Sequence, residues 1–413
     1  MNLFFKDVKV VERMKEGPLG PYIVSYAEQL HAEGYARQSA CTQLRLVSDF
    51  SRWLGQKDLT ANEVIAQHTG DYLRYRKRRG YRPRLGAPAA LARLLKLLRE
   101  QGVIAQQSKG LATTWGERLV REFDVYLEKE RVLAPATRIN YLPFVRQFLA
   151  LQFGKRPVEL SSLCATDVTG FVRCHAAHLN GKRVQLMTTA LRSFLRFARH
   201  RGDITVDLAA CVPAVASWSL SALPRALPPA QVKQVLENCN RKTAVGRRDY
   251  AMLLLLARLG LRGGEVASLN LEDIDWENGF LSLRGKAGRS SQLPLPADVG
   301  EAITAYLKDG RPRISSSRRV FLRARAPVVG FQGQQAVGDV VKHALARAGI
   351  DSPYKGAHQF RHGLATEMLK RGASLQEIGE ILRHQSPETT AIYAKVDLVS
   401  LRELATPWPG GVR

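Results

Sequence analysis

The 413-residue chain has few cysteines, no long hydrophobic run and a shortage of acidic residues. Its five cysteines form no paired CxxC motif, so neither a zinc ribbon nor a disulfide framework is indicated. The longest apolar run, residues 250–261, is too short to cross a bilayer and contains Arg258. Residues 1–20 are charged rather than signal-like. We therefore expect a cytoplasmic protein with reduced cysteines and no membrane partner.

The shortage of acid is the strongest compositional signal. Asp and Glu number 37 against 62 Lys and Arg, which leaves a net charge of +25, and the basic residues are spread along the whole chain. Such an excess indicates a polyanionic partner. Composition alone leaves DNA, RNA and an anionic membrane open. The hydrophobic content of 45% is that of a globular protein, and the length allows several domains.

Two segments of the N-terminal half resemble each other at an offset of 98 to 100 residues. Residues 91–104 align with residues 191–204, so that an apolar helix face and the glycine after it coincide. Duplication of a small helical domain is the favoured interpretation, and chance similarity of helices is the alternative. The sequence thus predicts an extra N-terminal helical domain at 1–107 and a second helical domain at 115–210.

The C-terminal part differs from both helical copies. A proline-rich linker is predicted at 211–229, and a domain of mixed helices and strands at 230–413. Strand patterns begin at Ile274 and Phe280, with an Asn278-Gly279 turn between them, and a third covers residues 292–295. The predicted fold class is mainly α with a small antiparallel sheet, in which helical N-terminal domains precede an α+β domain.

A cluster of cationic and titratable residues marks the C-terminal domain. His358, Arg361 and His362 lie at the start of an apolar-faced helix. His384 falls in a short connection between two predicted helices, and Tyr393 follows in the second of them. The spacing of His358 and His362 resembles a zinc protease motif, but Gln359 replaces the required base and no third ligand is suggested. Clustered cations with a tyrosine suit phosphoryl transfer better than metal binding.

Four segments resemble the signature blocks of the tyrosine recombinases, or phage integrase family. They are "ARLGLRGGEVASLNLEDI", "GKAGRSSQLPL", "HQFRHGLATEMLKRG" and "LRHQSPETTAIYAKV", which begin at residues 257, 285, 358 and 382. The blocks occur in family order within residues 227–396. This resemblance implies the tyrosine-recombinase catalytic fold at 230–413 and makes residues 115–210 the core-binding, DNA-contacting domain.

The resemblance assigns roles to individual residues. Arg262 and Arg361 match the two phosphate-binding arginines of the family, and Glu265 matches the structural acidic companion of the first. Lys286 matches the lysine that protonates the departing 5′ oxygen. His358 matches the proton-transfer residue of the HxxR pair.

Two further catalytic residues follow from the last block. His384 matches the residue that hydrogen-bonds the scissile phosphate, and Tyr393 matches the nucleophile. A free phenol has a pKa of about 10, so this tyrosine needs neighbours that remove its proton or stabilise its developing charge. His362 has no counterpart among these roles and is interpreted as a structural or solvent-facing residue.

The resemblance also implies a reaction and its partners. The expected activity is site-specific recombination of double-stranded DNA through a covalent 3′-phosphotyrosine, without cofactor, metal or ATP. A homo-tetramer on paired sites and accessory recombinases are the implied partners, and the long N-terminus favours a mobile-element integrase over a chromosome-dimer resolvase. Alternatives are a type IB topoisomerase-like enzyme that relaxes DNA and a non-catalytic DNA-binding protein descended from a recombinase.

Further DNA contacts are predicted from exposed basic positions. Phosphate contacts position a protein on DNA, whereas base contacts specify the sequence, and nothing in the chain identifies the bases. Residues 1–107 are expected to add a DNA or protomer contact. The predicted backbone-contacting residues are Arg138, Arg146, Lys182, Arg183, Arg284 and Arg289.

Overall fold

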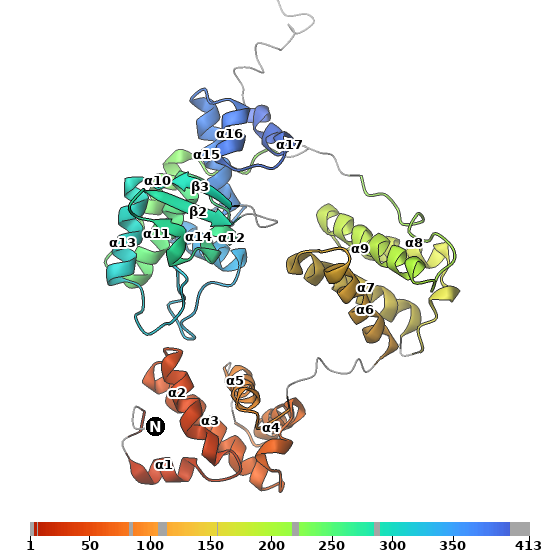
Figure 1. Cartoon of the computed structure of the whole chain (residues 1–413), viewed down its shortest axis with the longest axis vertical. Coiled ribbons are helices and arrows are strands. Elements are labelled where there is room, and N and C mark those ends of the chain that lie inside the picture. Colours follow the sequence, from red (N-terminus) through yellow and green to blue (C-terminus); the bar gives the residue numbers. More distant parts are fainter. Residues whose placement is uncertain are drawn as a thin grey trace, which may run out of the picture. The chain divides into compact units, whose positions relative to one another are not determined.

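The computed structural model describes residues 4–5, 7–81, 86–105, 114–154, 156–216, 223–284 and 290–396 (Figure 1). Met1–Ile104 and Leu220–Arg413 form one compact unit, and Ala105–Ser219 forms a second. The described residues are mainly helical, with one small antiparallel sheet, which confirms the predicted fold class. None of the described helices combines the length and the hydrophobicity needed to cross a membrane.

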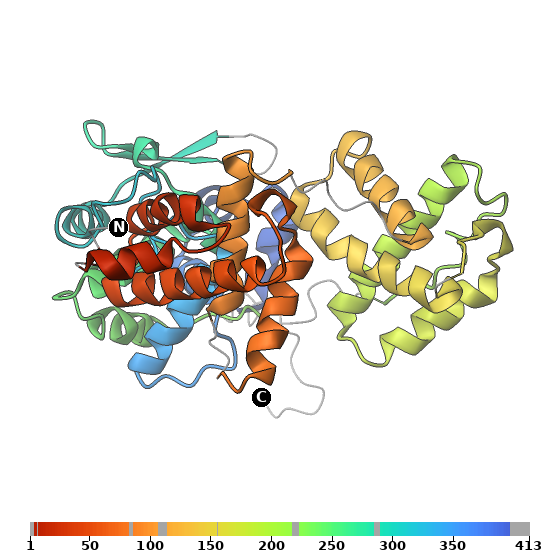
Figure 2. The same ribbon diagram turned by 90° about the horizontal axis from the view of Figure 1, so that it is seen from below.

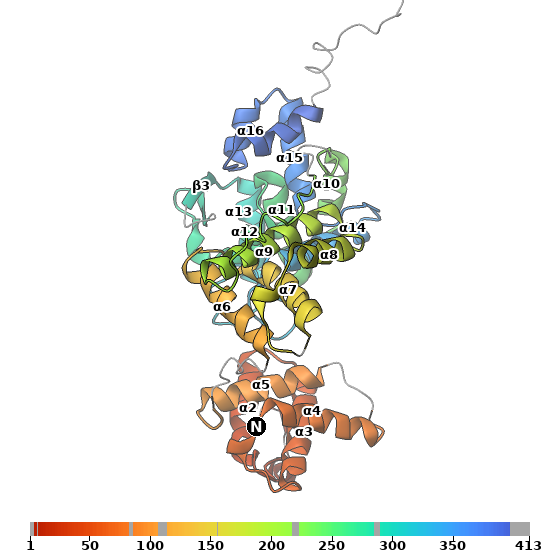
Figure 3. The same cartoon turned by 90° about the vertical axis from the view of Figure 1, so that its right-hand side faces the viewer.

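Residues 4–104 build a helical core of their own. Helices α3 and α5 (Figure 3) supply much of it. Their buried side chains include Leu44, Phe50 and Leu94. The element bounds are α1 Val8–Met14, η1 Gly20–Tyr22, α2 Ile23–Ala32, α3 Arg37–Gly55, η2 Ala61–Glu63, α4 Ala66–Arg78 and α5 Ala87–Glu100, where η denotes a 3-10 helix.

Residues 119–212 bury a second core, which is rich in phenylalanine. Phe123 and Phe194 meet edge to face with ring centroids 5.4 Å apart, and Phe148 meets Phe171 in the same way at 5.2 Å. The helices of this core lie together as one group, coloured from light orange to yellow-green in Figure 2. Their bounds are α6 Trp115–Lys129, α7 Pro135–Phe153, η3 Leu160–Ser162, α8 Ala165–Ala176 and α9 Gly181–His200.

The two helical cores repeat one arrangement of elements. Helices α3 and α7 are both 19 residues long, and they begin 98 residues apart after the alanine caps Ala36 and Ala134, which share nearly the same backbone angles. The 3-10 turns η2 and η3 begin 99 residues apart, as do α4 and α8. Helices α5 and α9 end 100 residues apart. This correspondence supports the duplication inferred from the sequence.

The third core belongs to the C-terminal region and surrounds α11, in which Leu253, Leu254, Leu255 and Leu256 are all buried. A helix that is apolar on every side must be covered on every side, and α13, α14 and α15 all contact it. The helices are α10 Pro229–Glu237, α11 Ala244–Leu259, α12 Gly263–Ser268, η4 Leu271–Asp273, α13 Ala297–Asp309, α14 Gln334–Arg347, α15 His358–Lys370, α16 Leu375–Ile381, α17 Pro387–Thr390 and η6 Ala391–Val396.

The sheet consists of β1 Ile274–Asp275, β2 Phe280–Arg284 and β3 Ser290–Pro294, in the order β1-β2-β3 and antiparallel throughout. The predicted turn joins β1 to β2, with Gly279 at a φ of 70°, where a side chain would be strained. Leu281 and Leu283 face the core. Arg284 pairs with Ser290, the last pair before the connection between β2 and β3. Residues 285–289, which form that connection, lie outside the described residues.

One element differs from the sequence prediction. Ser386 caps a helix with Pro387 at its first position, as expected, but that helix ends after four residues and continues as the 3-10 helix η6, which carries Tyr393. The β-branched residues Thr389, Thr390 and Ile392 lose side-chain freedom in an α-helix, which favours a short element here.

Equivalent phenylalanines allow a test of the separate helical cores. Phe50 and Phe148, 98 residues apart, are both fully buried. Replacing either with Ala should destabilise its own core by about 3–5 kcal/mol, since a large cavity remains. Native-state hydrogen exchange should lose protection within residues 4–104 for Phe50→Ala and within 119–212 for Phe148→Ala. The exposed Leu151→Ala is the control; loss of protection in both regions from one substitution would contradict separate cores.

Candidate active site

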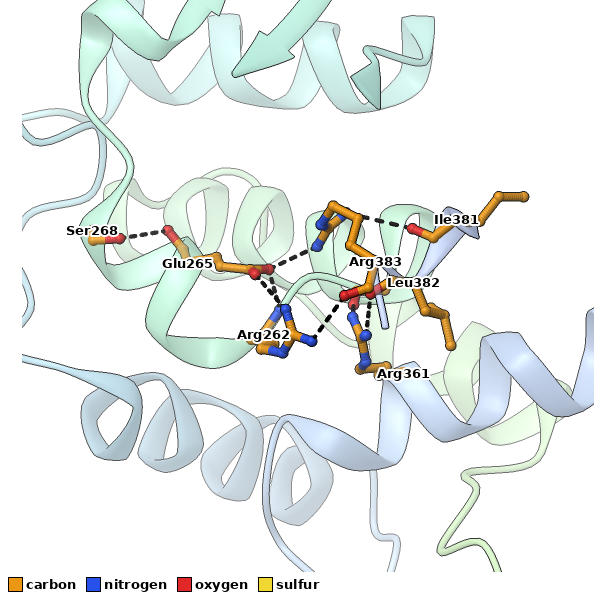
Figure 4. Close-up of polar contacts among 8 residues, drawn as sticks. Arg262, Glu265, Ser268, Arg361, Ile381, Leu382 and Arg383 are labelled. Atoms are coloured by element: carbon orange, nitrogen blue, oxygen red, sulfur yellow. Dashed lines mark hydrogen bonds and ion pairs between the residues drawn. The ribbon is translucent and has the colours of Figure 1, made fainter. Parts of the chain in front are cut away.

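Arg262 and Glu265 form a hydrogen-bonded pair at the site (Figure 4). Arg262 is the residue before α12, and its backbone N–H donates to the Glu265 carboxylate at 2.8 Å, which caps the helix. Its guanidinium donates to the other carboxylate oxygen at 2.9 Å and to the Arg383 carbonyl at 3.3 Å. The predicted structural role of Glu265 is visible in these contacts.

Arg383 is a third arginine of the cluster, and no sequence pattern predicted it. Its Nη2 donates to Glu265 at 2.8 Å, so one carboxylate serves two guanidinium groups. Burial opposes the charge on Glu265, but Arg383 and Arg262 outweigh it and hold the pKa of that carboxyl below its ordinary value. The backbone of Arg383 has a φ of 55°, the left-handed region, which directs the side chain back toward α12.

Arg361 is the most buried arginine of the group. It lies in the first turn of α15, and its guanidinium donates to the Gly260 carbonyl at 2.6 Å and to the Leu382 carbonyl. Gly260 ends α11 in the left-handed conformation, which exposes its carbonyl to this contact. Burial, together with the charges of Arg262 and Arg383, lowers the pKa of Arg361 to about 10.

Tyr393 is buried, with only 1% of its surface exposed. Burial raises its pKa to about 12, although Arg361 lies near enough to oppose the shift. Its hydroxyl is 2.9 Å from Nδ1 of His362, one of the two histidines of α15. The interpretation of His362 as structural or solvent-facing missed this contact, because no sequence pattern joins residues 31 positions apart.

His384 lies beside the same tyrosine. Its ring is parallel to that of Tyr393, with centroids 6.4 Å apart, and its Nδ1 is 2.7 Å from the hydroxyl of the buried Thr390. Burial, followed by the charges of Arg361 and Arg262, lowers the pKa of His384 to about 4. The imidazole is therefore neutral at pH 7, and Thr390 fixes the orientation of its ring.

His358 begins α15, one turn before His362, and its side chain is the more exposed of the two. Partial burial and the charges of Arg361 and Arg262 lower its pKa. The two imidazole rings lie 6.4 Å apart. His358 therefore belongs to the cluster electrostatically, while His362 is the histidine in contact with the tyrosine hydroxyl.

An open pocket of about 750 Å³ adjoins the arginines. Arg262 and His384 line it, together with Arg284 and Ser290, which are the last residue of β2 and the first of β3. Lys286 and Arg289, predicted as catalytic and DNA-contacting, lie outside the described residues.

The arrangement is suited to an anion. Arg262, Arg361 and Arg383 lie around one carboxylate, and burial, together with the charges of the other two arginines, depresses the pKa of Arg361. A bound phosphate would supply the missing negative charge and accept hydrogen bonds from guanidinium groups. The structure thus brings together the described members of the predicted catalytic set, which are Arg262, His358, Arg361, His384 and Tyr393.

The predicted DNA-contacting residues differ in how available they are. Arg138 has only 15% of its side chain exposed and is bound by Asp124 and Glu128, with N–O distances of 3.4 and 2.8 Å. Arg146 pairs with Glu117 at 3.1 Å. Lys182 and Arg183 are exposed in the first turn of α9, and the side chain of Arg284 is 81% exposed.

Profiles of known families match two segments of the chain. "Phage integrase family" matches residues 225–398, which include the cluster described above. "Phage integrase, N-terminal SAM-like domain" matches residues 120–202, which coincide with the second helical core.

Known proteins resemble the chain over most of its length. "Putative integrase/recombinase y4rA" of Sinorhizobium fredii is 50% identical over 411 residues, which cover 99% of each chain. "Tyrosine recombinase XerD" of Listeria monocytogenes is 28% identical over 294 residues, which cover 69% of this chain and 96% of that protein.

Solved structures share the fold at low sequence identity. XerH site-specific recombinase bound to a palindromic difH substrate aligns with a TM-score of 0.54 and 18% identity, over 69% of this chain and 83% of that one. A lambda integrase(75-356) dimer bound to a COC′ core site aligns with a TM-score of 0.51 and 17% identity, over 67% and 94%. With this fold, these matching profiles and a relative half identical over its full length, the chain belongs to the phage integrase family of tyrosine recombinases.

Proposed function

We propose that the protein recombines double-stranded DNA at a specific site through a covalent 3′-phosphotyrosine on Tyr393. The observation that carries this proposal is the cluster of Arg262, Arg361, His384 and Tyr393, contributed by four separate elements to one place. The family resemblance assigns these residues to the scissile phosphate, and the positive charge of the site suits that ligand.

The proposed step begins when the hydroxyl oxygen of Tyr393 attacks phosphorus. The new bond joins that oxygen to the 3′ phosphate, the bond to the 5′ oxygen breaks, and Lys286 supplies the proton that leaves with the 5′ hydroxyl. Arg262 and Arg361 hold phosphate oxygens whose negative charge grows in the transition state. His384 is neutral, and in the tautomer whose Nδ1 accepts from the hydroxyl of Thr390 its Nε2 carries the hydrogen and can donate to the phosphate.

Religation is the reverse attack by a 5′ hydroxyl from the partner duplex. The energy of the phosphodiester is retained in the phosphotyrosine, so no nucleotide cofactor is needed. Strand exchange between two duplexes requires a cleaving subunit for each of four strands, and a homo-tetramer on paired sites meets that requirement. Integration or excision of a mobile element is the proposed role, supported by the integrase/recombinase name of the half-identical relative.

Trapping the covalent intermediate tests the proposed chemistry. A duplex selected from random DNA by binding to the full-length protein is nicked at a series of positions near its centre, so that cleavage releases a short strand and cannot be reversed. Wild type should form a denaturation-resistant protein–DNA adduct, and Tyr393→Phe should form none. Arg262→Ala and Arg361→Ala should cleave about 100- to 1000-fold more slowly, because each loses a transition-state donor.

Two outcomes of that experiment would contradict the proposal. The first is an adduct that survives Tyr393→Phe. The second is the absence of an adduct with wild type on any nicked duplex. Relaxation of supercoiled plasmid without a preferred site would favour the type IB topoisomerase alternative, and site-specific binding without cleavage would favour the non-catalytic one.

The carboxylate of Glu265 should also control stability. Its pKa is lowered, so its contribution is fully present above the unfolded value and is lost as the pH falls through the lower folded value. Glu265→Gln should reduce the free energy of unfolding at pH 7 by about 1–3 kcal/mol, because buried guanidinium groups lose their partner.

Urea unfolding at pH 7 and at pH 3 measures this effect. The difference in the free energy of unfolding between Glu265→Gln and wild type should shrink at pH 3, because protonation of the wild-type carboxyl removes its charge. Glu388→Gln, on the exposed start of α17, is the control. An equal difference at both pH values would contradict a charge-dependent role for Glu265.

The extra N-terminal domain is proposed to add a DNA contact. Helix α4 ends in the exposed residues Lys77, Arg78 and Arg79, at the helix terminus where cations are also favoured by the dipole. Exposed cations that bind phosphates release counterions, so binding weakens with salt in proportion to the number of contacts.

Salt dependence of binding tests this domain in the full-length chain. Changing Lys77, Arg78 and Arg79 together to Gln should reduce the slope of log affinity against log salt by about 2 to 3. The charge-matched control changes the exposed basic residues Arg13, Lys15 and Lys96 to Gln. Equal slopes for the α4 variant and wild type would remove α4 from the DNA contact.

A further inference from the structure

Tyr393 makes a contact that the proposed function leaves unused. Among the described residues, His362 is the only hydrogen-bond partner of the tyrosine hydroxyl, at 2.9 Å from Nδ1. The proposed reaction begins at this oxygen, so a group in contact with it is in contact with a reacting atom. His358, to which the family resemblance gives proton transfer, makes no hydrogen bond to this oxygen.

The imidazole of His362 is held by a rigid element. It lies on α15 one residue after Arg361, whose guanidinium is bound to the carbonyls of Gly260 and Leu382. At Gly363 the helix passes so near the Leu227 carbonyl that an added Cβ would lie 2.7 Å from it. The backbone on both sides of His362 is therefore fixed, and a side chain on a fixed backbone can orient a partner.

The protonation states determine the direction of the hydrogen bond. Burial, followed by the charges of His358, Arg361 and Arg225, lowers the pKa of His362 to about 4, so the ring is neutral. Burial raises the pKa of Tyr393 to about 12, so the phenol keeps its proton. With both groups neutral, and with Nδ1 the only acceptor for the phenol O–H among the described residues, we assign the O–H as the donor and place the imidazole hydrogen on the other ring nitrogen.

We infer that His362 orients the Tyr393 hydroxyl and receives its proton as the oxygen attacks phosphorus. This inference rests on the proposed function. While the bond from the tyrosine oxygen to phosphorus forms, the O–H proton moves to Nδ1, and the bond to the 5′ oxygen breaks with protonation by its own donor. On religation the imidazolium returns the proton to the tyrosine oxygen. Proton transfer accompanies attack and does not precede it, since the phenol is a far weaker acid than the imidazolium.

Two amides distinguish this role from packing. The side-chain amide of Asn reaches the position of Nδ1 in a histidine, whereas that of Gln reaches the position of Nε2. Single-turnover cleavage of the nicked duplex should fall about 1000-fold for His362→Gln, which loses both the hydrogen bond and the proton acceptor, and about 100-fold for His362→Asn, which keeps the hydrogen bond but cannot accept the proton. DNA affinity should stay within about twofold of wild type for both. The exposed His343→Gln on α14 is the control and should cleave at the wild-type rate.

A second measurement separates the nucleophile from the leaving group. A substrate with sulfur in place of the bridging 5′ oxygen needs no proton on departure, so the His362→Gln defect should persist on it. Ring-fluorinated tyrosine at position 393 has a more acidic phenol and depends less on a proton acceptor. With it, the difference between His362→Gln and wild type should shrink by about tenfold or more.

The possible outcomes separate the inference from the proposed function. Equal rates for His362→Gln and His362→Asn, or a His362→Gln defect that fluorination leaves unchanged, would overturn the role of His362 while Tyr393 remained the nucleophile. If His362→Gln does not fold, the fluorination test is applied to His362→Asn, whose remaining defect must shrink. The absence of an adduct with wild type would instead refute the proposed function itself.

Discussion

The site depends on one carboxylate that is shared by two buried or half-buried guanidinium groups. Glu265 contacts Arg262 and Arg383, while Arg361 lies close enough for both arginines to lower its pKa. Like charges at this separation repel, and the folded chain tolerates them because backbone carbonyls and Glu265 satisfy their hydrogen bonds. Repulsion among the arginines lowers the stability of the fold and leaves a cavity that favours an anion, as is common at functional sites.

Much of this arrangement could be predicted from the sequence, because local signals and motif order were both strong. The Asn278-Gly279 step located the hairpin, and the Ser374 and Ser386 caps located the last helices. The candidate catalytic residues were predicted from the resemblance of whole blocks rather than from any single residue. Arg383 was not predicted because its role depends on a left-handed backbone that an arginine rarely adopts.

The contact of His362 with Tyr393 was beyond prediction for a different reason. It joins two segments through tertiary packing, and each residue alone fits an ordinary helix face. The 3-10 helix at Tyr393 was also not predicted. Capping residues predict where a helix begins, but they do not predict where an α-helix changes to a 3-10 helix. Arg138 was predicted to contact DNA because it is basic, and the structure adds what the sequence could not show, its ion pairs with two acidic side chains.

The two helical copies conserve a core and change a surface. Phe50 and Phe148 occupy equivalent buried positions, whereas the exposed Arg78 at the end of α4 corresponds, at the offset of 99 between α4 and α8, to the exposed Ala177. Packing restricts the first kind of position, and solvent leaves the second free to vary. One fold can therefore present unlike electrostatic faces within a single chain.

The tyrosine belongs to a small hydrophobic cluster with Ala365, Ile378 and Leu382, separate from the main core of its region. A cluster of that size can open locally at a cost well below that of global unfolding. Leu382 connects such opening to the arginines, because its side chain packs in the cluster and its carbonyl binds Arg361. Local opening of this cluster would thus take one acceptor away from the Arg361 guanidinium, so release of Tyr393 and binding of an anion would be coupled.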